Sequence, residues 1–389
     1  MFFKTNLLQF PFVILLIKFF SFASFKKATN PNEVVYVWDL NKGTLKYQLV
    51  GHSSNVLCLA ALDNGLLASG GYDARIKIWN MTTGELKYDL DESDHSAYIH
   101  LLVKLEQNLL ATGSNKGVTV WNVTDGRKEF NLVMGLINGL VLDMTLLPKN
   151  LLAVSLDALG EAHIRIYNLN TRLLKFSLKS SLGNYLMASD RRDLLISAGF
   201  SIDNPDEKTL KVYNITTGKL KYTLDTGSSF SSLTPLSSIL IGQTFDDEVN
   251  MFSGRIYGWN LSTGKMNFNL SGNSTDTGEI QSLDTSRVAI KTGNNSIKIL
   301  NVETGEIIFK LKEISYRIDQ YEFNIPAMAK SMCVLDKSFL ASSANMSVNI
   351  WDTIKGELKF ILKSDLKNTL SLARLDNGLL AGAHGLLPK

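Results

Sequence analysis

Histidine, cysteine and clustered carboxylates are the side chains of this sequence that could perform acid–base, nucleophilic or metal chemistry. Five histidines are scattered along the chain: His52, His95, His100, His163 and His384. No two of them have a His-x-x-x-His or similar metal-ligand spacing. Cys58 and Cys333 each lie in an apolar run, which indicates buried small side chains rather than a disulfide framework or thiolate ligands. Neither a Gly-x-Ser-x-Gly nucleophile elbow nor a phosphate-binding glycine loop occurs, so we expect no catalysis, no cofactor and no metal.

One twelve-residue phrase recurs eight times and supplies the framework for these residues. Its clearest copy is WNMTTGELKYDL (residues 79–90), and successive copies begin 41 to 51 residues apart. The copies begin at Trp38, Trp79, Trp121, Tyr167, Tyr213, Trp259, Leu300 and Trp351. Each has an aromatic residue nine positions after its start. Seven have glycine five positions after the start, where Arg172 stands in the remaining copy. Two alternating segments around a polar turn predict a β-hairpin, and the recurrence predicts a repeat protein.

Each repeat unit contains four predicted strands, which we term a, b, c and d in chain order. In the clearest unit, strands a, b and c cover residues 55–62, 66–70 and 75–79, and strand d is the second half of the phrase. The chain begins with strands c and d alone (residues 34–49) and finishes with strands a and b alone (residues 369–383). If the N-terminal strands c and d pair with the C-terminal strands a and b, eight four-stranded antiparallel sheets close into a ring. We therefore predict an all-β fold.

Residues 67–80 (LASGGYDARIKIWN), preceded by Gly51-His52, resemble a unit of the WD-repeat β-propeller family. The resemblance covers residues 34–383 and implies a single eight-bladed propeller, with seven blades as the alternative if one degenerate unit is not a blade. In that family a His, a Ser or Thr, an Asp and a Trp of one blade form a hydrogen-bonded structural tetrad. Carried over, the tetrad residues are His52, Ser69, Asp73 and Trp79. The next unit is incomplete: it keeps His95, Thr112 and Trp121 but has Asn115 in the Asp position.

The resemblance implies a rigid, non-catalytic scaffold that presents the loops of one propeller face to partner proteins or peptides. A first alternative is an exported quinoprotein-like enzyme with eight blades, because the Thr-Gly-Glu/Lys-Leu-Lys-aromatic turn also resembles the repeat of quinoprotein dehydrogenases. Those repeats carry Trp where this chain has Tyr or Phe, and the chain lacks their adjacent cysteine pair. A second alternative is an extracellular glycoprotein receptor module, because eight Asn-x-Ser/Thr triplets occur. Four of these triplets share one turn position, where Asn and Thr are favoured for turn hydrogen bonds: Asn80, Asn122, Asn214 and Asn260.

Insertions between strands are the candidate binding elements, because loops carry binding in repeat proteins. Three consecutive units enlarge the connection between strands b and c, at residues 156–162, 201–208 and 244–254. The second and third connections contain six carboxylates: Asp203, Asp206, Glu207, Asp246, Asp247 and Glu248. A long connection from strand d to strand a on the same face contains Tyr316, Tyr321 and Phe323. We expect a partner-binding rim whose acidic part fits a basic segment. The alternatives are solvated acidic loops and aromatics that pack back on the ring.

Residues 1–30 lie outside the repeat and form a hydrophobic leader, whereas residues 31–389 form the propeller. A basic start at Lys4, an apolar stretch and small residues at Ser21 and Ala23 are typical of a signal peptide. A membrane anchor and an unstructured tail are the alternatives. If residues 1–24 act as a leader, we expect a secretory or membrane-attached protein, and otherwise a cytoplasmic one. Membrane contact is expected only through residues 1–25. A formal net charge of +3 implies no nucleic-acid partner, and a closed ring predicts a monomer.

Overall fold

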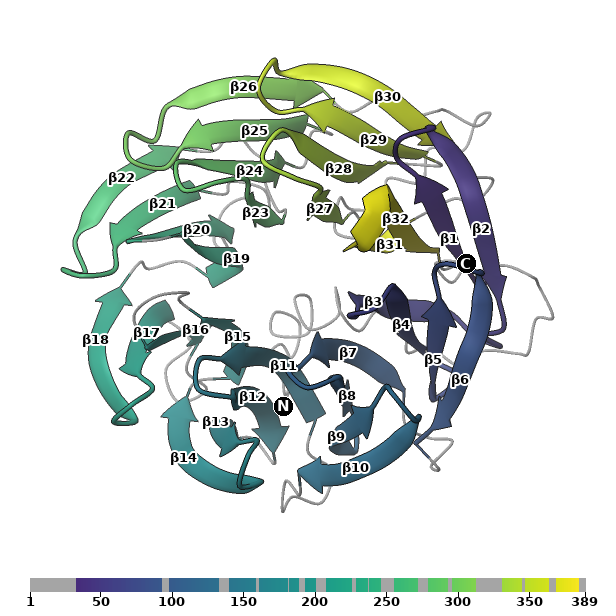
Figure 1. Ribbon diagram of the computed structural model, residues 1–389. Helices are drawn as coiled ribbons and strands as arrows, with labels where there is room; N and C mark the ends of the chain where they lie inside the picture. The colour runs from purple at the N-terminus through teal and green to yellow at the C-terminus, as the bar shows by residue number, and fades with distance from the viewer. Residues whose placement is uncertain are drawn as a thin grey trace, which may run out of the picture.

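The computed structural model describes residues 33–92, 98–132, 140–158, 161–180, 182–188, 193–200, 208–225, 229–236, 238–245, 255–271, 279–292, 296–312, 331–344, 347–363 and 369–384. Within these residues, thirty-two strands form eight four-stranded antiparallel sheets. The sheets stand as blades around a ring, with strand a of each unit innermost and strand d on the circumference (Figure 1). The prediction of an all-β, eight-bladed propeller is confirmed, and the seven-blade alternative is wrong.

The four strands of each blade follow one another from the centre of the ring to its circumference. The blade that contains the first and last described strands, which we call the closing blade, consists of β31 (Thr369–Leu375), β32 (Leu379–His384), β1 (Val34–Asp39) and β2 (Thr44–Val50), with a 3₁₀ turn η2 (Asp376–Gly378). The next three are β3 (Val56–Ala61), β4 (Leu66–Gly71), β5 (Arg75–Asn80), β6 (Glu85–Asp91); β7 (Ile99–Lys104), β8 (Leu109–Ser114), β9 (Gly117–Asn122), β10 (Arg127–Leu132); and β11 (Leu140–Leu147), β12 (Leu151–Ala158), β13 (Glu161–Asn168), β14 (Leu173–Ser180). Two further blades are β15 (Leu182–Ala188), β16 (Leu194–Phe200), β17 (Lys208–Asn214), β18 (Lys219–Asp225); and β19 (Ser229–Leu236), β20 (Ile239–Phe245), β21 (Arg255–Asn260), β22 (Met266–Ser271). The last two are β23 (Ile280–Ser282), β24 (Arg287–Thr292), β25 (Ser296–Asn301), β26 (Ile307–Lys312); and β27 (Met332–Val334), β28 (Phe339–Ala344), β29 (Ser347–Asp352), β30 (Glu357–Lys363).

The turn between strands c and d is built in the same way in all eight blades. The second residue of the repeated phrase is Asn or Asp, and its side-chain oxygen accepts a backbone N–H two residues later at 2.8–3.0 Å. The glycines at the sixth residue of the phrase have φ between 65° and 79°, where a residue without Cβ is favoured. Asn168 and Asn301 make the same turn bond although neither begins a glycosylation triplet. Turn geometry by itself therefore explains the asparagines that do begin one.

One predicted loop, residues 156–162, is instead mostly part of a sheet. Strand β12 continues to Ala158 and β13 begins at Glu161, with backbone pairs Leu156↔His163 and Ala158↔Glu161. All four strands of this blade are eight residues long, so the additional residues extend the ladder rather than form a loop. The two longer connections, after β16 and after β20, belong to neighbouring blades.

A contact between neighbouring blades, which we call the blade clasp, explains the repeated aromatic and the repeated glycine together. The strand-d aromatic of one blade packs beneath the turn glycine of the next, so that a Cβ added to Gly84 would lie 2.6 Å from Tyr47 Cδ1. The Tyr47 hydroxyl also donates a hydrogen bond to Thr82 O at 2.6 Å. Aromatic–glycine pairs occur at six further junctions, and an added Cβ would lie 2.4–2.8 Å from the aromatic at four of them but 3.4 Å and 3.8 Å from it at Gly264 and Gly43. At the eighth junction the guanidinium carbon of Arg172 lies 4.6 Å from the ring centre of Phe130. The clasp therefore joins all eight blades.

The apolar core lies between blades rather than within any one of them. One cluster joins Val37 and Leu49 of the closing blade to Leu67 and Trp79 of the next blade, and the other clusters follow the same plan. Each sheet is thus covered on both faces by its neighbours, and the second strand of the β3–β6 blade is buried over its whole length. Removing one part of a blade exposes apolar surface on two neighbours.

The first and last described strands pair with each other. β1 and β32 are antiparallel, with Val35 opposite Ala383 and Asp39 opposite Leu379. In Figure 1 the purple β1 and yellow β32 lie side by side in the closing blade. Residues 1–32 lie outside the described residues, so the domain boundary at residue 30 stays a prediction. Within the part of the chain that the structure describes, no helix has the length and apolar character needed to cross a bilayer.

Candidate functional site

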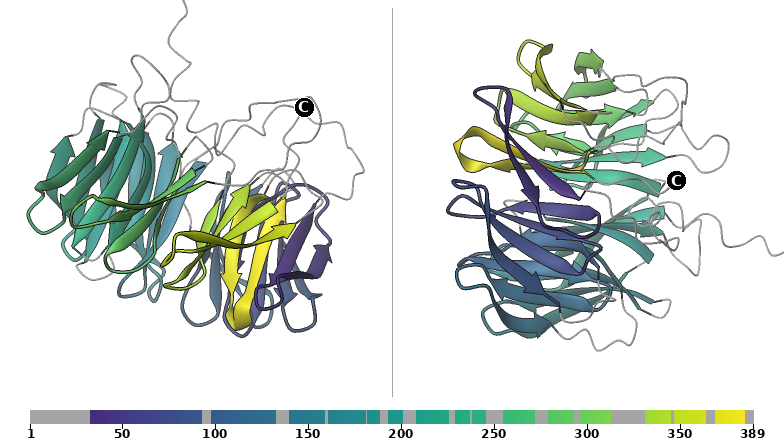
Figure 2. Two further views of the ribbon diagram at one scale, coloured as in Figure 1. Left: turned by 90° about the horizontal axis from the view of Figure 1, so that it is seen from above. Right: turned by 90° about the vertical axis from the view of Figure 1, so that its right-hand side faces the viewer.

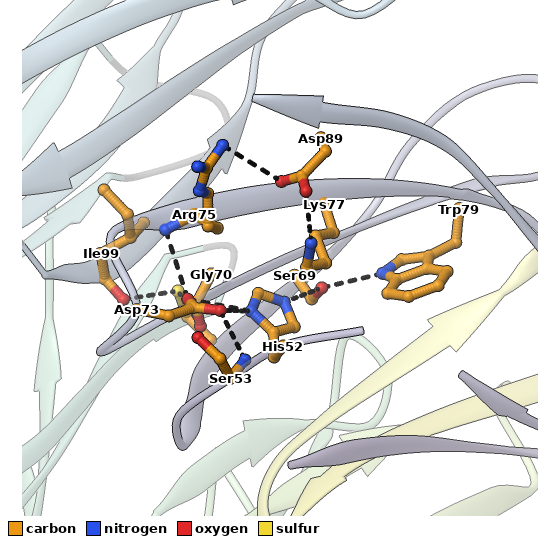
Figure 3. Close-up of polar contacts among 11 residues, drawn as sticks. His52, Ser53, Ser69, Gly70, Asp73, Arg75, Lys77, Trp79, Asp89 and Ile99 are labelled. Atoms are coloured by element: carbon orange, nitrogen blue, oxygen red, sulfur yellow. Dashed lines mark hydrogen bonds and ion pairs between the residues drawn. The ribbon is translucent and has the colours of Figure 1, made fainter. Parts of the chain in front are cut away.

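The structure brings His52, Ser69, Asp73 and Trp79 together in the β3–β6 blade (Figure 3). His52 precedes β3, Ser69 lies on β4, Asp73 lies in the β4–β5 turn and Trp79 lies on β5. His52 Nε2 is 2.7 Å from Ser69 Oγ, and His52 Nδ1 is 2.9 Å from Asp73 Oδ2. The indole N–H of Trp79 donates to Ser69 Oγ at 2.9 Å. Four residues that are distant in the sequence thus form one continuous hydrogen-bonded chain.

Asp73 is the charged end of this network. Burial opposes its ionisation, but hydrogen bonds from His52 and from the backbone N–H groups of Ser53 and Arg75 outweigh burial and hold the pKa of Asp73 below its ordinary value. With a proton on Nδ1 alone, His52 donates to the ionised carboxylate of Asp73 and accepts from the Ser69 hydroxyl at Nε2. Ser69 Oγ in turn accepts from the indole N–H of Trp79, so the polar side-chain groups of these four residues are all hydrogen-bonded within the network.

The Ser69–His52–Asp73 connection has the same order as a catalytic Ser-His-Asp triad, so its accessibility decides what chemistry it can perform. Ser69 is fully buried, and the side chains of His52 and Asp73 are 0% and 4% exposed. A triad serine must reach an incoming carbonyl, whereas Ser69 Oγ already lies against the Trp79 indole. The arrangement favours holding the loop before β3 against the blade over attacking a substrate.

Two other blades contain part of this network. Trp121 Nε1 donates to Thr112 Oγ1 at 3.1 Å, and Trp351 Nε1 donates to Ser342 Oγ at 2.9 Å. In the β7–β10 blade the carboxylate of Glu92 accepts from Thr112 at 2.9 Å, a role that the sequence did not indicate. Glu92 follows strand d of the preceding blade, so nothing in the local pattern pointed to it. His95, the predicted member of this blade, lies outside the described residues.

The sequence also did not indicate the buried ionisable residues between the β23–β26 and β27–β30 blades. The Glu279 carboxylate accepts the backbone N–H of Met332 at 2.6 Å, across the junction between the blades. Lys291 is 1% exposed and donates to Ser343 O at 2.8 Å, across the same junction. Burial raises the pKa of Glu279, although the hydrogen bonds from Met332 and Gln281 and the charge of Lys291 oppose the rise. Such contacts depend on three-dimensional pairing of residues about fifty positions apart, for which the sequence carries no local signal.

Neither cysteine has the environment of a reactive thiol. Cys58 Sγ lies 3.7 Å from Gly70 O and 3.6 Å from Ile99 O, and both cysteines are free. Burial raises the pKa of both thiols, that of Cys333 to about 11. Both stay protonated near neutral pH, which makes them poor nucleophiles and poor metal ligands. Among the described residues no group of three or more His, Cys, Asp or Glu side chains is arranged to hold a metal ion.

Replacing Asp73 with Asn is expected to lower the free energy of unfolding by about 2 kcal/mol at pH 7, because a charge-assisted buried network loses its anion. The depressed pKa of Asp73 stabilises the fold above the ordinary value of 3.8, and this contribution is lost as the pH falls through the folded-state value. The difference between parent and variant should therefore shrink in acid. Urea unfolding at pH 7 and near pH 3 measures both effects.

The matched control is Asp63→Asn, because Asp63 pairs with Lys104 on the surface and its side chain is 53% exposed. An exposed pair contributes less than about 1 kcal/mol. If Asp73→Asn and Asp63→Asn lower the free energy of unfolding equally, the buried network contributes no more to stability than an exposed ion pair.

The predicted partner-binding rim cannot be placed in the structure. Its residues all lie outside the described residues: Asp203, Asp206, Glu207, Asp246, Asp247, Glu248, Tyr316, Tyr321 and Phe323. The described strands show only that the two acidic connections follow β16 and β20 of adjacent blades. Their convergence into one rim stays a prediction.

Comparison with known proteins connects this blade to a family. Residues 43–80 match the family described as WD domain, G-beta repeat, and this stretch contains all four residues of the network. Mitochondrial division protein 1 of Aspergillus clavatus is 41% identical over 51 residues, which are 13% of this chain and 8% of that protein. The probable E3 ubiquitin ligase complex SCF subunit sconB of Aspergillus terreus is 44% identical over 70 residues, which cover 16% of this chain and 10% of that protein. The small ribosomal subunit protein RACK1y of Oryza sativa subsp. japonica is 39% identical over 69 residues, which cover 18% of this chain and 20% of that protein.

A solved structure extends the likeness to the whole ring. The crystal structure of the computationally designed Ika8 protein aligns with a TM-score of 0.67 at 21% identity, over 87% of this chain and 96% of that one. At this identity the likeness concerns the fold alone. The repeat match, the relatives and the ring of eight blades together support a WD-repeat β-propeller.

Proposed function

We propose that this protein is a non-catalytic scaffold that binds partner proteins or peptides at the loops of one face of its ring. The observation that carries the proposal is the blade clasp, which recurs at all eight junctions and fixes each blade against the next. A ring fixed in this way holds its loops at constant spacing, so little conformational entropy is lost when a partner binds. The quinoprotein-like alternative gains no support from the geometry of the described residues.

The names of two relatives support a role in assemblies. RACK1y is named as a protein of the small ribosomal subunit, and sconB is named as a subunit of an SCF ubiquitin ligase complex. Each matched segment covers no more than a fifth of the relative, so their partners are not carried over to this chain. The shared feature that we propose for this protein is assembly with other proteins through the propeller.

We further propose that the two acidic connections, after β16 and after β20, dock a basic segment of the partner. They bring six carboxylates to adjacent blades of a chain whose overall formal charge is +3. Local charge of one sign steers an oppositely charged segment and fixes its orientation. The aromatic residues Tyr316, Tyr321 and Phe323 are the proposed apolar anchors beside them.

A binding assay on the intact chain tests the docking proposal. The six loop carboxylates are changed to Asn or Gln, and binding of a fluorescent octalysine peptide is followed by anisotropy. We expect at least about tenfold weaker binding, because several close charge pairs are lost. The control changes six exposed acids elsewhere in the described residues: Glu85, Glu106, Asp125, Glu303, Glu306 and Glu357. If both variants lose binding equally, the effect is net charge and the proposed docking site is wrong.

Capture of partners tests the scaffold proposal itself. The immobilised chain is incubated with an extract of its source cells, and bound proteins are identified by mass spectrometry. The expected result is a set of proteins that is retained by the parent chain and lost from the loop variant. The proposal fails if the recovered proteins are the same with the parent chain and with a heat-denatured chain.

A further inference from the structure

Three neighbouring hairpins on the circumference combine exposed apolar side chains with basic residues. They are the strand c–d turns and most of strand d in the β11–β14, β15–β18 and β19–β22 blades, covering residues 169–178, 215–224 and 261–270. Figure 1 shows β14, β18 and β22 in succession along the outer edge of the ring, and in both views of Figure 2 the hairpin turns of the coloured blades gather on one side. We call this surface the basic rim.

The apolar side chains of the basic rim project into solvent. Leu173 is 67% exposed, and Leu174, Leu220 and Met266 are 48%, 50% and 49% exposed. Leu174, Leu220 and Met266 occupy the same position of the repeat, seven residues after each phrase begins, so they lie at equivalent points on adjacent blades. Leu173 stands where the other seven copies have Thr, Arg, Lys or Glu. The same repeat position is also apolar and exposed at Leu45, Leu86 and Ile307 in other blades, so the apolar residue particular to this rim is Leu173.

The charge of the basic rim has one sign. Its three segments contain no Asp or Glu and five basic residues, namely Arg172, Lys175, Lys219, Lys221 and Lys265. These five charges exceed the formal net charge of the whole chain, +3. Two acids of the described residues lie nearby. Glu129 is 3.8 Å from Arg172. Asp193 pairs with Lys149 at 2.6 Å, and the charge of Lys175 also lowers the pKa of Asp193. The four lysines of the rim are all exposed.

Two of these lysines lie at bulges in strand d. Each strand d has a bulge opposite strand c, and Lys175 and Lys221 are the extra residues of their bulges. Their ammonium groups lie 5.2 Å and 5.5 Å from the ring centres of Phe176 and Tyr222. Lys175 and Lys221 directly follow the exposed Leu174 and Leu220, so basic and exposed apolar residues are neighbours along each strand.

We propose that the basic rim docks on the surface of an anionic lipid bilayer. Basic residues near such a surface are attracted to its headgroups, and apolar side chains at hairpin tips enter the boundary between headgroups and acyl chains. Side chains that project this far from turn tips are convex features, and a bilayer deforms around them, whereas a peptide needs a groove for its own side chains. The sequence by itself predicts membrane contact only through residues 1–25, so the rim is a second, independent contact. It does not depend on the proposed partner-binding loops.

Vesicle binding by the full-length protein tests this inference. Co-sedimentation is measured with vesicles of phosphatidylcholine alone and with an equal mixture of phosphatidylcholine and phosphatidylserine, in about 0.1 M and about 1 M salt. We expect preferential binding to the mixed vesicles at low salt. The double variant Lys219→Glu, Lys221→Glu should bind them at least about tenfold more weakly, because two attractive charges become repulsive.

The matched control is Lys42→Glu with Lys46→Glu in the closing blade. Lys46 occupies the same bulge position as Lys221 and lies 4.9 Å from the Tyr47 ring centre, but its blade is opposite the β15–β18 blade across the ring. All variants share residues 1–32, so any contribution from that segment cancels. Equal loss in both double variants, or equal binding to both kinds of vesicle, overturns the proposal. Binding of oligoglutamate that depends on Lys219 and Lys221, without vesicle binding, also overturns it and assigns the rim to an acidic protein segment.

Discussion

Deletion of residues 368–389 is expected to abolish cooperative folding of the whole ring. This deletion removes β31 and β32, which are half of the closing blade, and leaves β1 paired with β2 alone. It also removes Leu375, Leu379 and Ala381 from the cluster in which Trp79 of the next blade is buried. Loss of this core should lower the free energy of unfolding by more than about 5 kcal/mol, which is the entire stability of many domains. Thermal unfolding followed by circular dichroism should show no cooperative transition.

A shorter deletion provides the control for this experiment. Removal of residues 385–389 leaves every strand of the closing blade intact, because β32 ends at His384. That variant should unfold at the temperature of the parent chain. If the longer deletion also unfolds at that temperature, pairing between β1 and β32 is not required for stability, and the ring does not depend on the closing blade. Aggregation of the longer deletion variant would agree with the exposed edge of β1.

The fold could be predicted from the sequence because each turn is determined by residues that lie within it. The Asn or Asp that begins the turn bonds to a backbone N–H two residues later, and the glycine adopts the positive φ that the turn requires. Eight copies of such a local signal identify eight hairpins. The incomplete units at the two ends of the repeat then favour a ring over a linear stack.

The spatial role of the glycine could not be read from the turn. The turn pattern assigns it to backbone conformation alone, whereas the structure shows that it also leaves space for an aromatic ring from the preceding blade. The two residues are about forty positions apart, as Tyr47 and Gly84 show. Nothing in either hairpin by itself indicates which surfaces meet across a junction. The sequence pattern did not indicate the buried hydrogen bonds of Glu92, Glu279 and Lys291 for the same reason.

The buried network of the β3–β6 blade could be anticipated only through family resemblance. His52, Ser69, Asp73 and Trp79 have no spacing that by itself predicts contact, because they come from a loop, two strands and a turn. Once the four-stranded blade is formed, Ser69 on β4 and Trp79 on β5 lie on adjacent strands, and His52 and Asp73 meet at one end. Only this blade shows the complete chain of hydrogen bonds among the described residues. The incomplete versions in other blades indicate that the fold does not require it in every unit.

Replacing Gly218 with Ala is expected to lower the free energy of unfolding by about 3 kcal/mol. Part of this loss, about 1 kcal/mol or more, comes from placing an L-residue at φ +69°. The remainder comes from the clasp, because the new Cβ would lie 2.5 Å from Phe176 Cδ1 and must displace a ring held between two blades. Urea unfolding monitored by tryptophan fluorescence measures the loss.

Gly43→Ala separates the two causes, because Gly43 has nearly the same φ, +65°, but its added Cβ would lie 3.8 Å from the nearest atom of Phe360. We expect this control to lower the free energy of unfolding by only about 1 kcal/mol, which is the cost of placing an L-residue at positive φ. Phe176→Leu in the Gly218→Ala background should then recover part of the larger loss, and a double-mutant cycle measures this coupling. Arg172 shows that the turn itself accepts a side chain, at φ +61°, where the guanidinium lies over Phe130. If the two alanine variants lose equal stability and the cycle shows no coupling, the glycine serves the turn alone, and the clasp does not hold the blades together.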